Sequence, residues 1–481
     1  MQPGEICIVM THPETIDRLL APRSIAVIGA SNSPASAGYS LVANLIRLGY
    51  RGEVYAVNPR SDEVQGLPAY ASIRDCPRQG IDLAVIAVRT PMVPDVLEQC
   101  GEAGVGTALI VSDGFADGGE DGKELQRQVV DIARRHQIRV VGPNTQGFYN
   151  AERNLLVMTG SAVPKESMKK EGVSIAAQTG LFLGGWLIRG MTAEGMGMNK
   201  SIDLGNMCDI DHTDMLGYLG ADPSTEVIVM HMDRLDRAGS FMRTARAIAP
   251  RKPVVVVKLG ASPAAREAIF SHTGSLAGDD SAFDALCAQS GVARASDFDE
   301  VEDLSRTFLH LAPLRGKRIG VINFSGATGI IACDACARFG LEVGPLSQAS
   351  IDAVAATLPA WASVSNPVDF MQSFEVDMRK TLTVALEALL ADPRVDGILL
   401  IVVTMASPPI DAYLNIVREL ADGGLTKPVA VWALGDEGSS REIQALSRKG
   451  VVAYPSITRA VRALAASYRR QQYLVSVEAG H

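Results

Sequence analysis

The sequence predicts an α/β protein made of three doubly wound, Rossmann- or flavodoxin-like domains in tandem. Short apolar runs rich in Val, Ile and Leu alternate with helical stretches along the whole chain, which is the pattern of parallel strands joined by crossover helices. Such continuous apolar runs are expected where helices cover both faces of a sheet. The 481 residues exceed one ordinary domain and suggest about three.

The first predicted domain spans residues 15–150. Each of its apolar runs is short and continuous, as expected for buried parallel strands. A loop rich in Gly, Ser and Pro follows the first run and leads into a helix over 39–48. The expected strands cover residues 24–29, 53–58, 83–88, 107–111 and 139–142.

Two further domains are predicted, over residues 165–312 and 316–475. A polar stretch over 151–170 with Pro164 predicts a boundary with little regular structure. The second domain is expected to contain strands over 173–177, 227–232 and 253–260, and a helix over 301–311. The third is expected to contain strands over 318–324, 397–403 and 429–434, and a helix over 457–473.

Composition excludes several classes of protein. A net charge of −9 argues against a general nucleic-acid binder, and no stretch of 18 uncharged apolar residues predicts a membrane span. The start of the chain lacks a secretory pattern, and its seven dispersed cysteines indicate reduced thiols in a cytoplasmic protein. Cys333 and Cys336 fall in a helical pattern with no second pair, so they predict packing residues, and no metal site is predicted.

Glycine-rich or polar segments follow the predicted strands of the first domain, where ligands of open parallel sheets bind. Gly29, Ala30 and Ser31 follow the first strand, but G-x-G-x-x-G is absent. That absence weighs against a standard NAD site, and hence against an NAD-dependent dehydrogenase.

Five strand-end segments in order, at residues 22–31, 57–60, 88–91, 112–115 and 142–145, resemble the CoA-binding domain of nucleoside-diphosphate-forming acyl-CoA synthetases, relatives of succinyl-CoA synthetase. One departure is Ser36, where the family usually has a lysine. Backbone N–H groups can still serve a phosphate there. The resemblance implies CoA contacts at Gly29, Ala30, Ser31, Asn58, Pro59, Val88, Arg89, Thr90, Gly114, Phe115 and Asn144.

His272 lies among small residues over 271–278, just ahead of a helical pattern that starts at Ser281. Small residues let a phosphate approach the backbone, and a helix N-terminus offers free N–H groups. A neutral imidazole there can accept a phosphoryl group. The alternative is a helix-capping loop with an incidental histidine.

The resemblance extends to this second domain, through residues 177–180, 205–206, 209–214 and 271–274. It implies that His272 carries the phosphoryl group. Asp233 would replace a family glutamate that orients the imidazole; the alternative is an exposed acid at a strand end. The implied phosphate contacts are Gln178, Thr179, Gly180, Thr273 and Gly274.

The third domain resembles the last α/β domain of the same synthetases, at residues 323–329 and 365–370. No P-loop motif is present, and the three domains leave no room for an ATP-grasp module. The resemblance therefore implies the alpha subunit of an NDP-forming acyl-CoA synthetase. CoA and a carboxylic acid would bind here, and ATP or ADP with Mg²⁺ on an ATP-grasp beta subunit of a hetero-oligomer. A non-catalytic CoA-sensing module is the alternative, because Ser36 and Asp233 depart from the family pattern.

Overall fold

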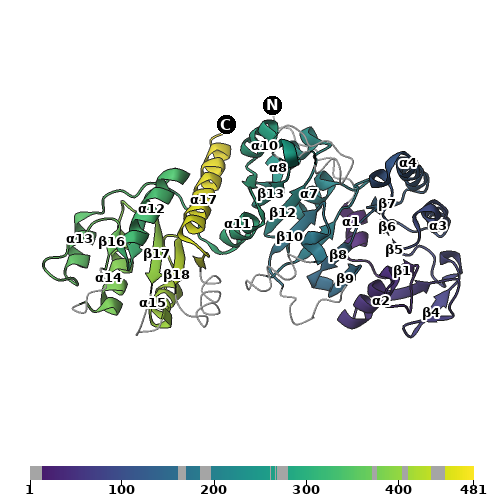
Figure 1. The fold of residues 1–481 in the computed structure, drawn as a ribbon, viewed down its shortest axis with the longest axis horizontal. Helices are drawn as coiled ribbons and strands as arrows, with labels where there is room; N and C mark the ends of the chain where they lie inside the picture. Colours follow the sequence, from purple (N-terminus) through teal and green to yellow (C-terminus); the bar gives the residue numbers. More distant parts are fainter. Residues whose placement is uncertain are drawn as a thin grey trace, which may run out of the picture. The chain divides into compact units, whose positions relative to one another are not determined.

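The computed structural model describes residues 13–160, 170–184, 197–260, 262–265, 267, 280–370, 376–403, 410–434 and 450–480. The chain divides into two compact units, Met1–Ser296 and Asp297–His481. Among the described residues, the first unit contains two sheets and the second contains one, and all three are rich in parallel strands (Figure 1). The predicted fold class is therefore confirmed. Within the described ranges, no helix is both long and apolar enough to cross a membrane.

The first sheet has the strand order β3-β4-β2-β1-β5-β6-β7. Its neighbouring strands are parallel except for the β3–β4 pair. Every strand predicted for this part of the chain is present. The strands are β1 (Ser24–Ile28), β2 (Glu53–Val57), β3 (Glu63–Val64), β4 (Leu67–Tyr70), β5 (Leu83–Ile86), β6 (Thr107–Ile110) and β7 (Arg139–Val141).

Helices cover both faces of this sheet. In β1, Ile25 and Val27 pack with residues of α1 (Pro13–Leu20) and α2 (Ala37–Leu48). The alternate residues of β1 pack with α3 (Val93–Glu102) and α4 (Gly119–His136). Because side chains alternate across a strand, β1 is apolar on both faces and buried throughout. Short 3₁₀ turns are η1 (Ile73–Asp75), η2 (Thr90–Met92) and η3 (Ala116–Gly118).

The first turn of α2 lies directly on the loop that follows β1. A Cβ added to Gly38 would lie 1.9 Å from the carbonyl oxygen of Gly29, and a backbone atom cannot move aside as a flexible side chain can. We expect Gly38→Ala to lower the free energy of unfolding by about 2–3 kcal/mol. Gly118→Ala is the matched control in urea denaturation, because a Cβ at Gly118 meets nothing within 4 Å. Equal stabilities of the two variants would contradict this packing.

The second sheet has the order β14-β13-β12-β10-β11-β8-β9. Its first five strands are parallel, and β8 and β9 add an antiparallel edge. The prediction of little structure over 151–170 is wrong for its first part, because η4 (Ala151–Arg153) and β9 lie there. The strands are β8 (Gly147–Asn150), β9 (Leu155–Met158), β10 (Val173–Ala177), β11 (Lys200–Asp203), β12 (Val227–Met232), β13 (Val254–Lys258) and β14 (Ala293–Ala295).

The β8–β9 edge joins the two sheets of the first unit. One apolar core runs from α1 and α2 through β8 and β9 to the helices of the second sheet. Two buried amides fasten the join: Asn44 Nδ2 donates to Met158 O over 3.1 Å, and Asn150 Nδ2 donates to Leu20 O over 2.8 Å. The helices of the second sheet are α5 (Leu181–Gly184), α7 (His212–Ala221), α8 (Ala238–Ile248) and α10 (Asp280–Ser290).

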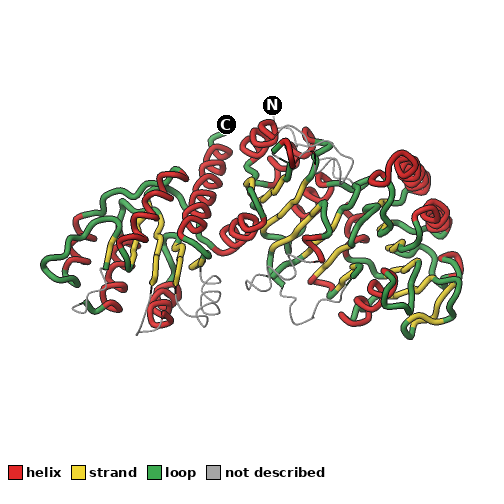
Figure 2. The backbone as a smooth tube through the Cα atoms, viewed as in Figure 1, coloured by secondary structure: helices red, strands yellow, loops and turns green. Residues whose placement is uncertain are grey.

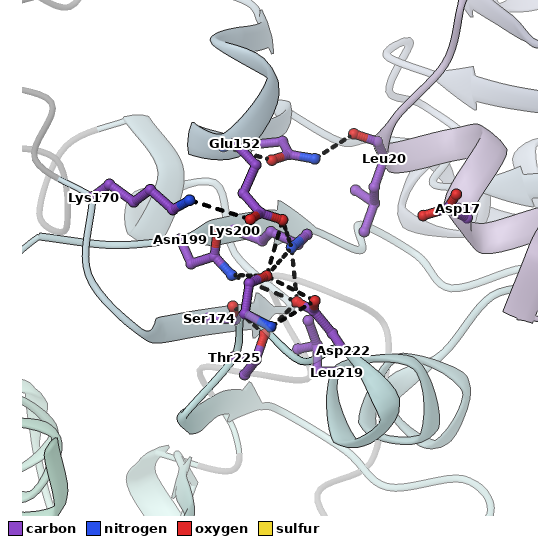
Figure 3. A network of polar contacts seen from close by, with 12 residues as sticks. Asp17, Leu20, Glu152, Lys170, Ser174, Asn199, Lys200, Leu219, Asp222 and Thr225 are labelled. Carbon is purple, nitrogen blue, oxygen red and sulfur yellow. Dashed lines mark hydrogen bonds and ion pairs between the residues drawn. The ribbon is translucent and has the colours of Figure 1, made fainter.

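A buried polar network stabilises the amino end of β11 (Figure 3). The Lys200 ammonium donates to Asp222 Oδ2 over 2.7 Å, to Glu152 Oε2 over 3.1 Å and to Ser224 Oγ over 2.9 Å. Its side chain is only 5% exposed, and that of Lys170, which also contacts Glu152, is 56% exposed. The network ties the turn after β8 to the end of α7.

The second unit contains one five-stranded parallel sheet, ordered β16-β15-β17-β18-β19 (Figure 2). Helices α14 and α15 pack on one face and α12 and α17 on the other. Cys333 and Cys336 lie in α12; burial raises the pKa of Cys336 to about 12, as suits a packing residue. The strands are β15 (Ile319–Asn323), β16 (Val368–Asp369), β17 (Gly397–Val403), β18 (Val429–Leu434) and β19 (Val451–Ala453). The helices are α11 (Phe298–His310), α12 (Gly326–Phe339), α13 (Gln348–Ala355), α14 (Met378–Ala391), α15 (Ile410–Asp422) and α17 (Ile457–Glu478).

Candidate functional site

The first two CoA-type loops meet at the carboxyl edge of the first sheet. Gly29 follows β1 with a φ of +94°, which an L side chain rarely adopts. Asn58, which follows β2, donates from Nδ2 to Ala30 O over 2.8 Å. Its Oδ1 accepts from Arg60 N over 2.9 Å. Asn58 therefore holds the two loops together.

The loops after β5, β6 and β7 are fastened in the same way. Ser112 Oγ donates to Val88 O over 2.5 Å, and Thr90 Oγ1 donates to Asp113 O over 2.6 Å. Asn144 has a φ of +61°, and its backbone N–H donates to Ser112 O over 2.8 Å. Hydrogen bonds thus link three of the predicted CoA-contacting segments into one surface.

The predicted CoA residues differ in their accessibility. Arg89 is exposed and available to an anionic ligand, whereas the Phe115 side chain is fully buried in the core between β1 and α4. A ligand can therefore contact Phe115 only through its backbone. The exposed members of the set are Pro59, Arg89, Gly114 and Asn144, the half-buried ones are Gly29, Ser31, Asn58, Val88 and Thr90, and Ala30 is buried like Phe115.

Ser36, which stands where the family usually has a lysine, is the N-cap of α2. Its hydroxyl oxygen accepts from Gly38 N over 3.1 Å. An N-cap satisfies one of the free N–H groups at the helix end. The side chain at this position thus has a structural role in the protein.

Gln178 brings the turn after β10 to the end of β12. Its backbone N–H donates to His231 O over 3.2 Å, and its Oε1 accepts from the amides of Asp233 over 3.1 Å and Arg234 over 3.4 Å. Thr179 Oγ1 accepts from Leu181 N over 3.3 Å at the start of α5. The structure therefore places Gln178, one of the predicted phosphate contacts, beside Asp233, the predicted orienting acid.

Asp233 is 8% exposed, so the alternative reading as an exposed acid at a strand end is wrong. Its Oδ1 lies 3.8 Å from His231 Nε2. Burial, and then the neighbouring His212, lower the pKa of His231 to about 3, and burial lowers the pKa of His212 to about 4. Both imidazoles are therefore neutral at pH 7, and His212 is the first residue of α7.

His272, Thr273 and Gly274 lie outside the described residues, so their roles stay predictions. The described chain resumes at Asp280, the first residue of α10. Across the described ranges, no group of three or more His, Cys, Asp and Glu side chains is arranged to hold a metal ion.

Hydrogen bonds from Asp117 through Asn206 to Arg234 form a polar relay that was not predicted from the sequence. This relay connects the CoA-type loops of the first sheet with the turns of the second sheet. Asp117 accepts from the amides of Gly114 over 2.9 Å and Phe115 over 3.1 Å, and from Asn206 Nδ2 over 2.8 Å. Burial would raise the pKa of Asp117, but these hydrogen bonds hold it below its ordinary value.

The relay continues from Asn206 into the second sheet. Asn206 O accepts from Arg234 Nη2 over 3.1 Å, and Arg234 is the neighbour of Asp233. Asn206 N also donates to Pro143 O over 2.9 Å, next to Asn144. Asp117 and Asn206 belong to different sheets, so no periodic pattern in the sequence indicates that they pair. Asn206 itself falls in one of the segments that resemble the family.

Asp203, at the carboxyl end of β11, is buried beside these loops. Burial raises the pKa of its carboxyl to about 6 from an ordinary value of 3.8, although the amides of Gln146 and Gly205 donate to it. Because the pKa of Asp203 is higher in the folded than in the unfolded chain, ionisation of its carboxyl destabilises the fold. The destabilisation is complete above the folded-state pKa and disappears as the pH falls below the pKa of the unfolded chain.

We therefore expect wild type to lose about 2–3 kcal/mol of stability relative to Asp203→Asn as the pH rises from about 4 to 7. Urea denaturation of both proteins across this range measures the difference. Parallel stability curves would contradict the raised pKa.

Three family models match the chain in the order of its sheets. The CoA binding domain matches residues 23–151, the succinyl-CoA ligase like flavodoxin domain matches 170–308, and the Ligase-CoA domain matches 319–476. This order of a CoA binding domain, a succinyl-CoA ligase like flavodoxin domain and a Ligase-CoA domain defines the class of the protein as succinyl-CoA ligase-like.

Individual relatives narrow the class. The chain is 36% identical over 392 residues to acetate–CoA ligase [ADP-forming] II of Archaeoglobus fulgidus, covering 81% of this chain and 57% of that enzyme. It is 33% identical to the alpha subunit of acetate–CoA ligase [ADP-forming] I of Pyrococcus furiosus, over 95% of this chain and 97% of that subunit. The chain therefore belongs to the ADP-forming acetate–CoA ligase family, and spans little more than half of the first relative.

A solved structure agrees with this assignment. The dinucleotide-forming acetyl-coenzyme A synthetase 1 of Ca. Korarchaeum cryptofilum, in complex with phosphate and ADP, matches with a TM-score of 0.86 at 29% identity. The match covers 97% of this chain and 98% of that one. The two chains thus share the same α/β fold over nearly their full length.

Proposed function

We propose that this chain is the alpha subunit of an ADP-forming acyl-CoA synthetase and that it transfers a phosphoryl group through His272. The observation that supports this most is the relay from Asp117 through Asn206 to Arg234. It connects a surface that resembles a CoA site with a turn that resembles a phosphate site, within one compact unit. A chain that only bound CoA would need no such second site.

The proposed reaction has two steps on this chain. Phosphate oxygen attacks the acyl-CoA carbonyl, the C–S bond breaks, and CoA leaves with a proton on sulfur. A ring nitrogen of His272 then attacks the phosphorus of the acyl phosphate. The P–O bond breaks, a carboxylate leaves, and a phosphohistidine remains, which keeps the acyl and nucleotide chemistry apart.

Asp233 would orient His272 by accepting a hydrogen bond from the ring nitrogen that does not react. Its burial and its position beside Gln178 suit that role. The neighbouring His231 and His212 stay neutral at pH 7 because of their low pKa values, so they place no competing positive charge beside the carboxylate.

The nucleotide half of the reaction belongs, in this proposal, to a separate ATP-grasp beta subunit that binds ATP or ADP with Mg²⁺. The name of the Pyrococcus relative as an alpha subunit supports a partner chain, and no P-loop motif occurs in the sequence. The proposal is therefore of a hetero-oligomer, and we place it in the cytoplasm. Acetate is the first carboxylic acid to test, because the relatives are named for it.

A partner-free exchange tests this function. The full chain is incubated with acetyl-CoA and [³²P]phosphate, and free CoA thiol and protein-bound label are followed together. We expect CoA release and a protein label that is stable in alkali and lost in acid. Tight CoA binding without label or CoA release, in a folded chain, would instead favour a non-catalytic CoA-sensing module.

A further inference from the structure

Lys258 is a buried cation at the carboxyl end of β13 that the mechanism above does not use. Its side chain is 2% exposed. In the part of the chain that the structure describes, its Nζ atom has no hydrogen bond. An ammonium group carries three donors, and a buried donor without an acceptor destabilises the fold, the more so when it is charged.

The contacts around Lys258 compensate for this burial only weakly. Nζ lies 3.7 Å from Asp280 Oδ1 and 5.6 Å from the centre of the Phe283 ring. The same Asp280 oxygen is held by Arg294 Nη2 at 2.6 Å. The Asp280 carboxylate therefore pairs closely with Arg294 and only distantly with Lys258.

The position of Lys258 in the sheet places its charge at the candidate phosphate site. In the parallel register of β12 and β13, Lys258 lies opposite Met232, one residue before Asp233. The strand on the other side of β12 is β10, which leads into Gln178. Lys258 thus ends one of three adjacent strands whose carboxyl ends form the candidate phosphate site.

We propose that Lys258 binds phosphate at this edge of the second sheet, where it supplies positive charge to the dianion that is transferred. This inference rests on the proposed function, because it names a further ligand-binding residue of the same site. The N-terminus of the eleven-residue α10, beside Lys258, adds favourable N–H dipoles. Without bound phosphate, Asp280 compensates the charge of Lys258 only weakly, from 3.7 Å.

The test measures binding of inorganic phosphate to the full chain by calorimetry. We expect Lys258→Met to weaken binding by roughly 10- to 100-fold, since a hydrogen bond to a charged group contributes about 1.5–3 kcal/mol. Lys252→Met is the matched control. Lys252 lies just before β13 at the opposite edge of the sheet, where its ammonium donates to Leu219 O over 3.2 Å. We expect this control to bind phosphate like wild type.

Asp280→Asn separates a binding role from a merely structural ion pair. If Lys258 serves only to pair with Asp280, both variants lose the same contact and behave alike. If Lys258 binds phosphate, Asp280→Asn removes a competing carboxylate and tightens binding. Tighter binding is therefore the expected result, and unchanged or weaker binding contradicts the proposal even where Lys258→Met does not fold.

Three results would overturn the proposal: no phosphate binding by wild type, unchanged binding by Lys258→Met, or unchanged or weaker binding by Asp280→Asn. The exchange of label from acetyl-CoA and [³²P]phosphate is run beside the calorimetry. Phosphate binding that depends on Lys258 without any covalent label would refute the phosphohistidine function and leave this inference standing. Label that Lys258→Met neither slows nor weakens would refute the inference alone.

Discussion

Replacing His272 by alanine should lower synthetase turnover by roughly 10⁴-fold or more, because the variant loses the nucleophile that carries the phosphoryl group. CoA affinity should stay within about twofold, since the CoA-type loops lie in the segment matched by the CoA binding domain, whereas His272 falls in the segment matched by the succinyl-CoA ligase like domain. Steady-state kinetics with the partner subunit and a separate CoA titration measure the two quantities.

His136→Ala is the matched control for this variant. His136 ends α4, and its Nε2 lies 2.7 Å from Glu98 Oε1, in a contact confined to the surface of α4 and α3. Its removal should leave turnover unchanged. Turnover by His272→Ala within tenfold of wild type, a margin of about 1.4 kcal/mol, would contradict the assigned role.

Lys200→Met should lower the free energy of unfolding of the first unit by about 3–5 kcal/mol. The substitution removes the ammonium that donates to Asp222 Oδ2 over 2.7 Å, and the Asp222 side chain is only 8% exposed (Figure 3). Methionine has a similar length but no charge, so the loss comes from the uncompensated carboxylate and not from a cavity. Urea denaturation measures the change.

Lys170→Met provides the comparison with an exposed lysine of the same network. Lys170 and Lys200 each hold one oxygen of Glu152, at 3.2 and 3.1 Å, but their side chains are 56% and 5% exposed. An exposed pair contributes about 0–1 kcal/mol, so Lys170→Met should change stability by no more than that. Equal losses in the two variants would show that burial does not decide the strength of this network.

The sequence predicted the parallel strands well because their apolar runs are continuous. Runs such as Val254–Lys258 and Gly397–Val403 bury both faces and leave a strong local signal. The β8–β9 edge was missed because β9 has only four residues, within a stretch that was expected to be irregular. Its burial against α2 is a contact between distant parts of the chain, as in the bond from Asn44 to Met158, and short-range patterns do not record it.

The candidate site was predictable where a segment carries its own pattern. The turn at Gln178 and the acid at Asp233 were expected, and the hydrogen bond from Asp233 N to Gln178 places them together. The relay through Asp117 and Asn206 was not, because the two residues meet only when the first and second sheets pack. Lys258 falls within the strand predicted over 253–260, and only its burial beside Asp280 reveals an unused charge.

The identity of the phosphorylated residue tests the central claim most directly. The chain is labelled with acetyl-CoA and [³²P]phosphate, digested under alkaline conditions that preserve phosphohistidine, and mapped by mass spectrometry. The proposed mechanism predicts one phosphoryl group, on His272, which disappears when CoA and acetate are added. A phosphoryl group on another residue, or synthetase turnover with no covalent phosphate on the chain, would contradict it.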